Sequence, residues 1–102
     1  MIKVIVKRQN ENVYEIDIKG HADYDDYGKD IVCASVSTMA ITTVNGINVL
    51  DESIEFEENS GSLIIRVIKE TDINQKLLNN MIDELSELVS QYPKNIEIRN
   101  ED

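Results

Sequence analysis

The sequence predicts an α+β fold with two layers, in which a mainly antiparallel sheet carries two helices packed on one face. Several short segments alternate between apolar and polar residues, and two longer segments repeat apolar residues at helical spacing. These elements follow one another in the order ββαββα, and a short final strand can follow them. Hairpins that alternate with helices favour an antiparallel sheet with its helices on one side.

Two hairpins are predicted from alternating segments on either side of turn-forming residues. Residues 2–7 and 14–19 each place apolar side chains on one face, and residues 9–12 separate them. Residues 54–57 and 63–68 repeat this pattern around the turn Asn59-Ser60-Gly61-Ser62. A short last strand would contain Ile96 and Ile98.

Two helices are predicted from apolar residues three or four positions apart. The first would follow Asp30, which suits an N-cap, and Gly46 leaves its C-terminal end uncertain by a few residues. The second would start at Asp72, which forms a capping-box-like pair with Gln75, and would stop at Pro93. The apolar positions are 32, 36, 39, 40, 43 and 47 in the first helix and 73, 77, 78, 81, 82, 85, 88, 89 and 92 in the second.

Length and charge restrict the possible functions. The 102 residues suit a single domain, residues 1–102, with one core, one site and no room for a cofactor domain. The net charge is −10, from 20 acidic and 10 basic residues. Such a charge repels nucleic acids and anionic membranes and favours cationic partners. It could equally serve only to keep the protein soluble.

The sequence indicates a soluble, cytoplasmic protein. Cys33 is the only cysteine, which excludes an intrachain disulfide and suits a reducing compartment. The N-terminal residues 1–4 lack a signal-peptide pattern. No apolar run approaches the roughly 18–20 residues that a membrane span requires, so no membrane partner is expected.

The single histidine and the single cysteine are the candidate catalytic pair. His21 would follow the first hairpin, and Cys33 would lie in the first helical turn after Asp30, where the helix dipole favours an anion. The dipole contributes only about 0.3–1 kcal/mol, so a thiolate nucleophile also needs an imidazolium within about 4–6 Å. The alternative is that the cysteine is a small buried apolar residue and the histidine a surface residue.

Metal sites fit the sequence poorly. Asp23, Asp25 and Gly28 match positions 1, 3 and 6 of a calcium-binding loop. Tyr27 and Ala34, however, occupy positions 5 and 12, where ligands are required. One cysteine and one histidine fall short of a four-ligand zinc site. We therefore expect neither a metal nor another cofactor.

The motif around the candidate pair resembles that of a known family. It reads Gly20-His21-Ala22, five loop residues, Gly28, one residue, Asp30-Ile31-Val32-Cys33-Ala34, and then Ser37 one turn further on. This closely resembles the ribosomal-processing cysteine protease family of certain bacteria. Length, element order and acidity fit along essentially the whole chain. His21 and Cys33 match the family's catalytic dyad, and Gly20, Gly28, Asp30 and Ser37 match its motif companions.

The resemblance implies a homodimeric cysteine endopeptidase that supports ribosome maturation. Its substrate would be a basic large-subunit ribosomal protein, from which it removes a short N-terminal extension after an aromatic pair. Cys33 would be the nucleophile and His21 the general base and acid. In the loop from Ala22 to Lys29, the aspartates would attract a cationic peptide, while Tyr24 and Tyr27 would add apolar contact.

Several alternatives stay open for the chain and for single residues. The protein could bind a ribosomal protein without cutting it, or Cys33 could be a redox sensor that is oxidised rather than acylated. Gly28 could let the loop close over a peptide or be a simple turn glycine. Asp30 could act through its charge or, as we prefer, only as the helix cap. Ser37 could hydrogen-bond the peptide or help to hold the loop.

Overall fold

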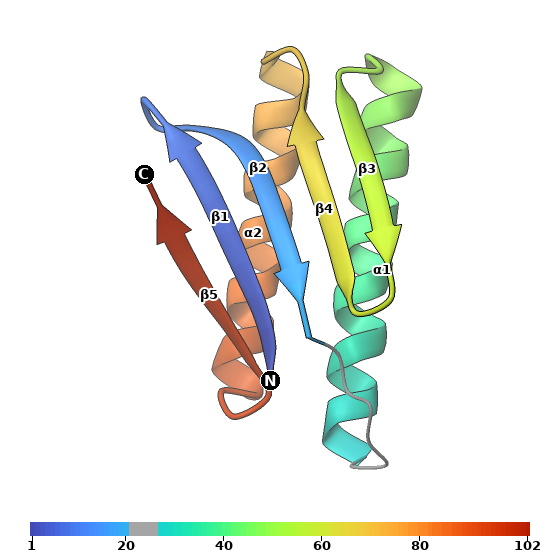
Figure 1. The fold of residues 1–102 in the computed structure, drawn as a ribbon, viewed down its shortest axis with the longest axis vertical. Coiled ribbons are helices and arrows are strands. Elements are labelled where there is room, and N and C mark those ends of the chain that lie inside the picture. Colours follow the sequence, from blue (N-terminus) through green and yellow to red (C-terminus); the bar gives the residue numbers. More distant parts are fainter. Residues whose placement is uncertain (21–26) are drawn as a thin grey trace.

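The computed structural model describes the backbone of residues 1–20 and 27–102 and the side chains of residues 1–20 and 31–102. Strands and helices follow one another in the predicted order, and the final strand is present (Figure 1). The elements are β1 (Ile2–Gln9), β2 (Asn12–Lys19), α1 (Tyr27–Leu50), β3 (Ile54–Asn59), β4 (Ser62–Val67), α2 (Asp72–Gln91) and β5 (Ile96–Glu101).

The sheet has five strands in the order β3-β4-β2-β1-β5. The pairs β1–β2, β2–β4 and β3–β4 are antiparallel. Strand β5 runs parallel to β1, with Ile96 opposite Ile2, because α2 returns the chain to the end of the sheet where β1 begins. Both helices lie behind the same face of the sheet (Figure 1). The predicted α+β class is therefore confirmed.

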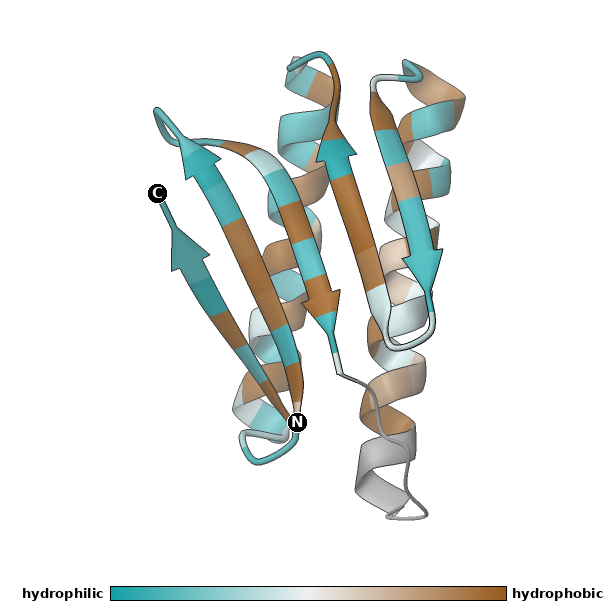
Figure 2. Cartoon of the chain, in the orientation of Figure 1, coloured by the Kyte–Doolittle hydropathy of each residue, from teal (hydrophilic) through white to brown (hydrophobic). Residues whose placement is uncertain are grey.

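The hydrophobic core lies between the sheet and the two helices. Alternate strand residues point into it, and Figure 2 shows apolar and polar residues alternating along β2 and β3. Full burial of one such side chain contributes about 1.5–3 kcal/mol, so these stripes fix which face of each element turns inward. Helix α1 contributes a stripe of fully or nearly fully buried residues, namely Val32, Val36, Ala40, Val44 and Ile47.

Helix α1 begins at Tyr27, three residues before the predicted N-cap. Asp30 therefore lies inside the first turn, and the predicted capping role is wrong. Carboxylates are favourable both at an N-cap and within the first turn, so the sequence pattern fits either position. Cys33 becomes the seventh residue of α1 and lies in its second turn, not the first. Because the dipole acts mainly within the first turn, it favours a thiolate there less than predicted.

Helix α1 continues through Gly46 to Leu50. By length and composition, the part from Ile31 to Leu50 is apolar enough to cross a membrane, which corrects the expectation that no segment approaches that length. A single helix of this length and composition is weak evidence for a membrane span, because core helices of soluble proteins share both features. Here the buried stripe of α1 packs against the sheet, so we treat α1 as a core helix.

Helix α2 begins one residue away from the predicted capping box. Thr71 is the N-cap: its side chain accepts a hydrogen bond from the Asn74 backbone N–H, and the Asn74 side chain accepts one from the Thr71 N–H. The predicted pair of Asp72 and Gln75 has the same spacing, shifted by one position. The Gln75 side chain instead donates to the Val13 carbonyl and accepts from the Val13 N–H, both at 2.8 Å. It thereby ties α2 to β2.

The apolar stripe of α2 is buried as predicted over most of its length. Leu78, Met81, Ile82, Leu85 and Leu88 belong to the core. The N-terminal member of the predicted stripe differs, because Ile73 is exposed while its neighbour Asn74 is fully buried. The polar contacts that Asn74 makes at the start of the helix hold this position inward.

A polar network joins the end of α1, the start of β3 and the start of α2. The Asn74 amide donates to the Ser53 hydroxyl and to the Lys69 carbonyl, both at 2.8 Å. The Thr71 hydroxyl donates to the Asp51 carboxylate at 2.6 Å. Hydrogen bonds from Ser53 and Thr71 lower the pKa of Asp51. Because a buried amide without partners is costly, this network holds the two helices in a fixed relation.

Substitution of Asn74 by alanine is expected to lower the free energy of unfolding by about 2 kcal/mol or more. It removes one half of the capping box and leaves buried partners unpaired. Asn80→Ala is the matched control, since Asn80 is exposed on the same helix. Urea unfolding followed by circular dichroism measures both variants. Equal unfolding midpoints for Asn74→Ala and Asn80→Ala would contradict this role of the network.

Candidate active site

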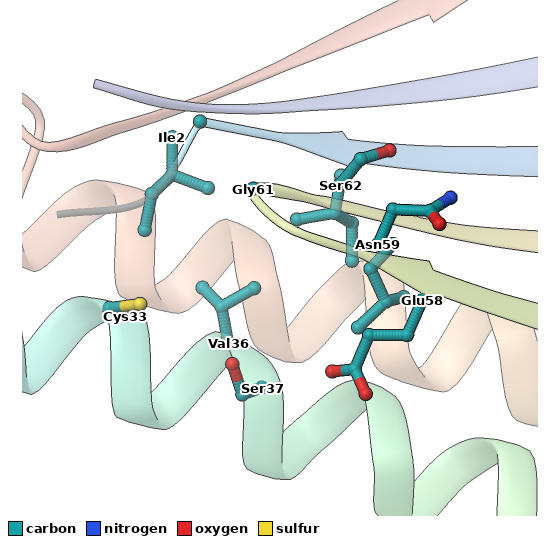
Figure 3. Close-up of a pocket in the computed structure, with 11 residues that line it drawn as sticks. Ile2, Cys33, Val36, Ser37, Glu58, Asn59, Gly61 and Ser62 are labelled. Atoms are coloured by element: carbon teal, nitrogen blue, oxygen red, sulfur yellow. The ribbon is translucent and has the colours of Figure 1, made fainter. Parts of the chain in front are cut away.

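Cys33 lies on α1 between two residues that anchor this helix to the sheet. Val32 and Val36 are almost completely buried, and Cys33 is half-buried beside them. Ser37 follows Cys33 by four residues and therefore lies on the same side of the helix. Figure 3 shows both side chains at a pocket between α1 and the sheet. The structure thus brings together two residues that the sequence motif singled out.

The pocket beside Cys33 has a volume of about 150 Å³. Its apolar wall consists of Ile2, Ile18, Val36 and Leu63. An apolar cavity of about this size accommodates a benzene molecule, so the pocket can hold one side chain of aromatic size. The half-buried thiol is accessible from this space.

The turn between β3 and β4 forms the opposite wall of the pocket. Gly61 of the turn lines the pocket together with Glu58 and Asn59 at the end of β3 and Ser62 at the start of β4 (Figure 3). The sequence pattern predicted this turn but gave no sign that it belongs to the site. The residues that predict a turn are adjacent in sequence, whereas the contact between this turn and α1 depends on the order of strands in the sheet. The pairing of β4 with β2 brings the turn next to the start of α1.

Gly20 occupies the other end of the pocket in a conformation that requires glycine. Its φ is +74°, in the left-handed region, and a Cβ atom there would lie 2.7 Å from the Met1 carbonyl oxygen. Its N–H donates to the Gly61 carbonyl at 3.0 Å. Gly20 therefore joins the end of β2 to the β3–β4 turn, immediately before His21 in the chain.

The side chains of the remaining predicted site residues lie outside the part of the chain that the structure describes. His21 and Tyr24 lie outside the described residues. Tyr27, Gly28 and Asp30 belong to the first turn of α1, and their side chains also lie outside the description. The contact between His21 and Cys33 therefore stays a prediction.

The candidate metal ligands in the sequence are the aspartates of the loop and the pair of His21 and Cys33. Asp23 and Asp25 of the calcium-like loop lie outside the described residues. Within the part of the chain that the structure describes, no three His, Cys, Asp or Glu side chains cluster closely enough to hold a metal ion. The pocket beside Cys33 combines an apolar wall with a thiol, hydroxyl groups, an amide and a carboxylate, a combination typical of ligand-binding pockets.

Comparison with known proteins gives a consistent assignment. The family model described as cysteine protease Prp matches residues 1–97. The ribosomal processing cysteine protease Prp of Staphylococcus aureus strain Mu50 is 33% identical, and the match covers 96% of this chain and 97% of that protein.

Two crystal structures of the essential ribosomal processing protease Prp from S. aureus have the same fold. The complex with a covalently linked product peptide has a TM-score of 0.86 at 32% identity, covering 99% of this chain and 100% of that chain. The complex with a substrate peptide has the same TM-score at 28% identity and the same coverage. The chain is therefore a cysteine protease and belongs to the Prp family.

Proposed function

We propose that this protease removes the N-terminal extension of a basic large-subunit ribosomal protein in the cytoplasm and so supports ribosome maturation. The observation that carries the proposal is the accessible thiol of Cys33, the single cysteine, at a pocket that fits an aromatic side chain. The relatives named ribosomal processing proteases support the substrate class. A net charge of −10 also suits a basic protein substrate.

In the proposed reaction, the Cys33 thiolate attacks the carbonyl carbon of the scissile peptide bond. The tetrahedral intermediate collapses to a thioester when the C–N bond breaks, and His21 gives a proton to the departing amine. Water, deprotonated by His21, then attacks the thioester and releases the carboxylate product and the thiol. The product covalently linked to the S. aureus relative supports a covalent mechanism of this kind.

The packing around Gly20 supports His21 as the base. Gly20 lines the pocket, donates a hydrogen bond to the Gly61 carbonyl, and leaves no space for a side chain beside the Met1 carbonyl. The residue that follows it therefore starts from a fixed point at the edge of the pocket. Because Gly20 and Cys33 line the same pocket and His21 follows Gly20 in the chain, we propose His21 as the base that serves Cys33.

Supporting roles are proposed for the other motif residues. Ser37 would hydrogen-bond the peptide backbone, since its side chain lines the pocket. Asp30 would act through its charge in the first turn of α1, because a capping role does not fit the start of the helix. Tyr24 and Tyr27 would contact the peptide, and Gly28 would give the loop freedom to close over it.

A homodimer is proposed in which the outward face of α1 forms the contact. No charged residue occurs from Ile31 to Leu50, although 29% of the chain is charged. Ile31, Ile41, Val49 and Leu50 are exposed along this helix. Two copies with a charge of −10 each repel one another, and an uncharged face is where they approach at least cost.

Cys33→Ala is expected to abolish cleavage of the ribosomal protein while peptide binding is retained. His21→Ala is expected to lower kcat/KM by about 10²–10⁴, the usual contribution of a general base. Mass spectrometry of the incubated substrate, in fully reducing and metal-free buffer, measures cleavage. Ser35→Ala is the control, since Ser35 is on α1 but is not among the pocket residues.

Three outcomes separate the proposed function from its alternatives. Binding without any cleavage by the wild-type protein would indicate a binding module. Cleavage that persists in Cys33→Ala would exclude Cys33 as the nucleophile. A response of Cys33 to oxidants, without cleavage under reducing conditions, would indicate a thiol sensor.

Gly20→Ala is expected to lower kcat/KM by more than its effect on folding explains. The left-handed backbone costs a non-glycine residue about 1–2 kcal/mol, and the Cβ would push against the Met1 carbonyl. Either effect moves the start of the His21 segment. The control is Gly46→Ala, which has open space and should raise the free energy of unfolding by about 0.5–1 kcal/mol. Unchanged activity in folded Gly20→Ala would contradict the positioning role.

Ile41→Glu is expected to convert the dimer to a monomer of 11.6 kDa. A carboxylate in the uncharged contact would be buried without a partner. Sedimentation velocity measures the mass, and Ile73→Glu is the control because Ile73 is exposed to 37%, close to the 40% of Ile41. A monomeric wild-type protein, or a dimer that survives Ile41→Glu, would contradict this interface.

A further inference from the structure

We propose that Glu58 determines specificity by selecting peptides with a basic side chain two residues from the apolar side chain in the pocket. This inference rests on the proposed peptidase function and adds a requirement on its substrate. Among the pocket residues within 1–20 and 31–102, Glu58 carries the only charged side chain. The carboxylate of Glu58 is therefore the candidate group for distinguishing bound peptides by the charge of their side chains.

Glu58 lies on the helix-bearing face of the sheet. It continues the alternate positions of β3 that begin with Ile54 and Phe56, both of which pack against the core. Its partner across the β3–β4 ladder is Leu63, a buried residue of the pocket wall. Figure 3 shows Glu58 extending from β3 toward α1, on the side where Ser37 lies. A carboxylate thus occupies the position where an apolar residue would continue the series.

Part of the charge on the opposite face of the same strands is already paired. Glu57 forms an ion pair with Arg66 at 3.4 Å, and Arg66 also lies 3.6 Å from Glu15. Glu58 forms no ion pair with any of the side chains of residues 1–20 and 31–102. Its exposed carboxylate takes no part in these ion pairs and can form one with a cationic group of a ligand.

The geometry of an extended peptide sets the spacing of the two contacts. Side chains two residues apart lie on the same side of a strand and are about 6.5–7 Å apart. With an aromatic side chain in the pocket, the second residue on either side can reach its rim, where Glu58 lies. A lysine or arginine at one of these two positions would then face the carboxylate. Which of the two it is depends on the direction of the peptide.

A second explanation of Glu58 makes a different prediction. Strand β3 is at the edge of the sheet, and an inward-pointing charge on an edge strand discourages pairing with other chains. That role needs no ligand. Under it, Glu58→Gln would increase self-association and would leave peptide selectivity unchanged.

The test measures binding of fluorescein-labelled peptides to the Cys33→Ala protein by fluorescence polarisation. Each peptide has one phenylalanine as anchor and either lysine or glutamine, two residues before or two residues after it. Glu58→Gln is added to remove the charge with little change in shape. Glu57→Gln is the matched control, because Glu57 is adjacent in sequence but lies on the opposite face of the sheet.

The proposal predicts that lysine at one of the two positions tightens binding about two- to fivefold over glutamine, the range of a partly exposed ion pair. Glu58→Gln should remove this preference and Glu57→Gln should keep it. No lysine preference, an equal loss in both variants, or no binding of any peptide would overturn the proposal. Cleavage by the Cys33-containing protein is measured separately, so failure of the peptidase function is distinguished from failure of Glu58 selectivity.

Discussion

The close approach of residue 20 to the carbonyl of Met1 is the constraint on which the site depends. No side chain fits between them, and the backbone of Gly20 has a left-handed conformation, so glycine is required at this point for two independent reasons. The same residue donates its N–H to Gly61. One residue therefore relates the first strand, the end of the second strand and the β3–β4 turn. These three parts surround the pocket at which the thiol lies.

Packing, more than the helix dipole, determines where the thiol lies. Val32 and Val36 are buried on either side of Cys33, and each contributes about 1.5–3 kcal/mol. The dipole contributes at most about 1 kcal/mol in the first turn, and Cys33 is in the second. The register of α1 against the sheet thus directs Cys33 and Ser37 to the pocket. A thiolate at Cys33 therefore requires stabilisation by a charged neighbour, and we propose His21 as that residue.

Local sequence patterns predicted the helices and strands. They failed to predict features that depend on contacts between these elements. Alternation predicted both hairpins, and helical spacing predicted both helices. The capping residues were wrong by a few positions, because Asp30 and Asp72 suit more than one place in a first turn. The burial of Asn74 follows from Ser53, 21 residues away in the chain. The position of Glu58 at the pocket follows from strand pairing and from the packing of α1, which no local pattern contains.

The proposed mechanism depends on a covalent acyl-enzyme that forms on Cys33 at this pocket. Intact-protein mass spectrometry after rapid acid quench, with a ribosomal extension peptide as substrate, tests it most directly. We predict a transient species whose mass exceeds that of the protein by the acyl group of the N-terminal fragment, because a thioester retains that fragment. The species should be absent in Cys33→Ala. Cleavage that proceeds with no such adduct, or an adduct that forms equally in Cys33→Ala, would contradict covalent catalysis by Cys33.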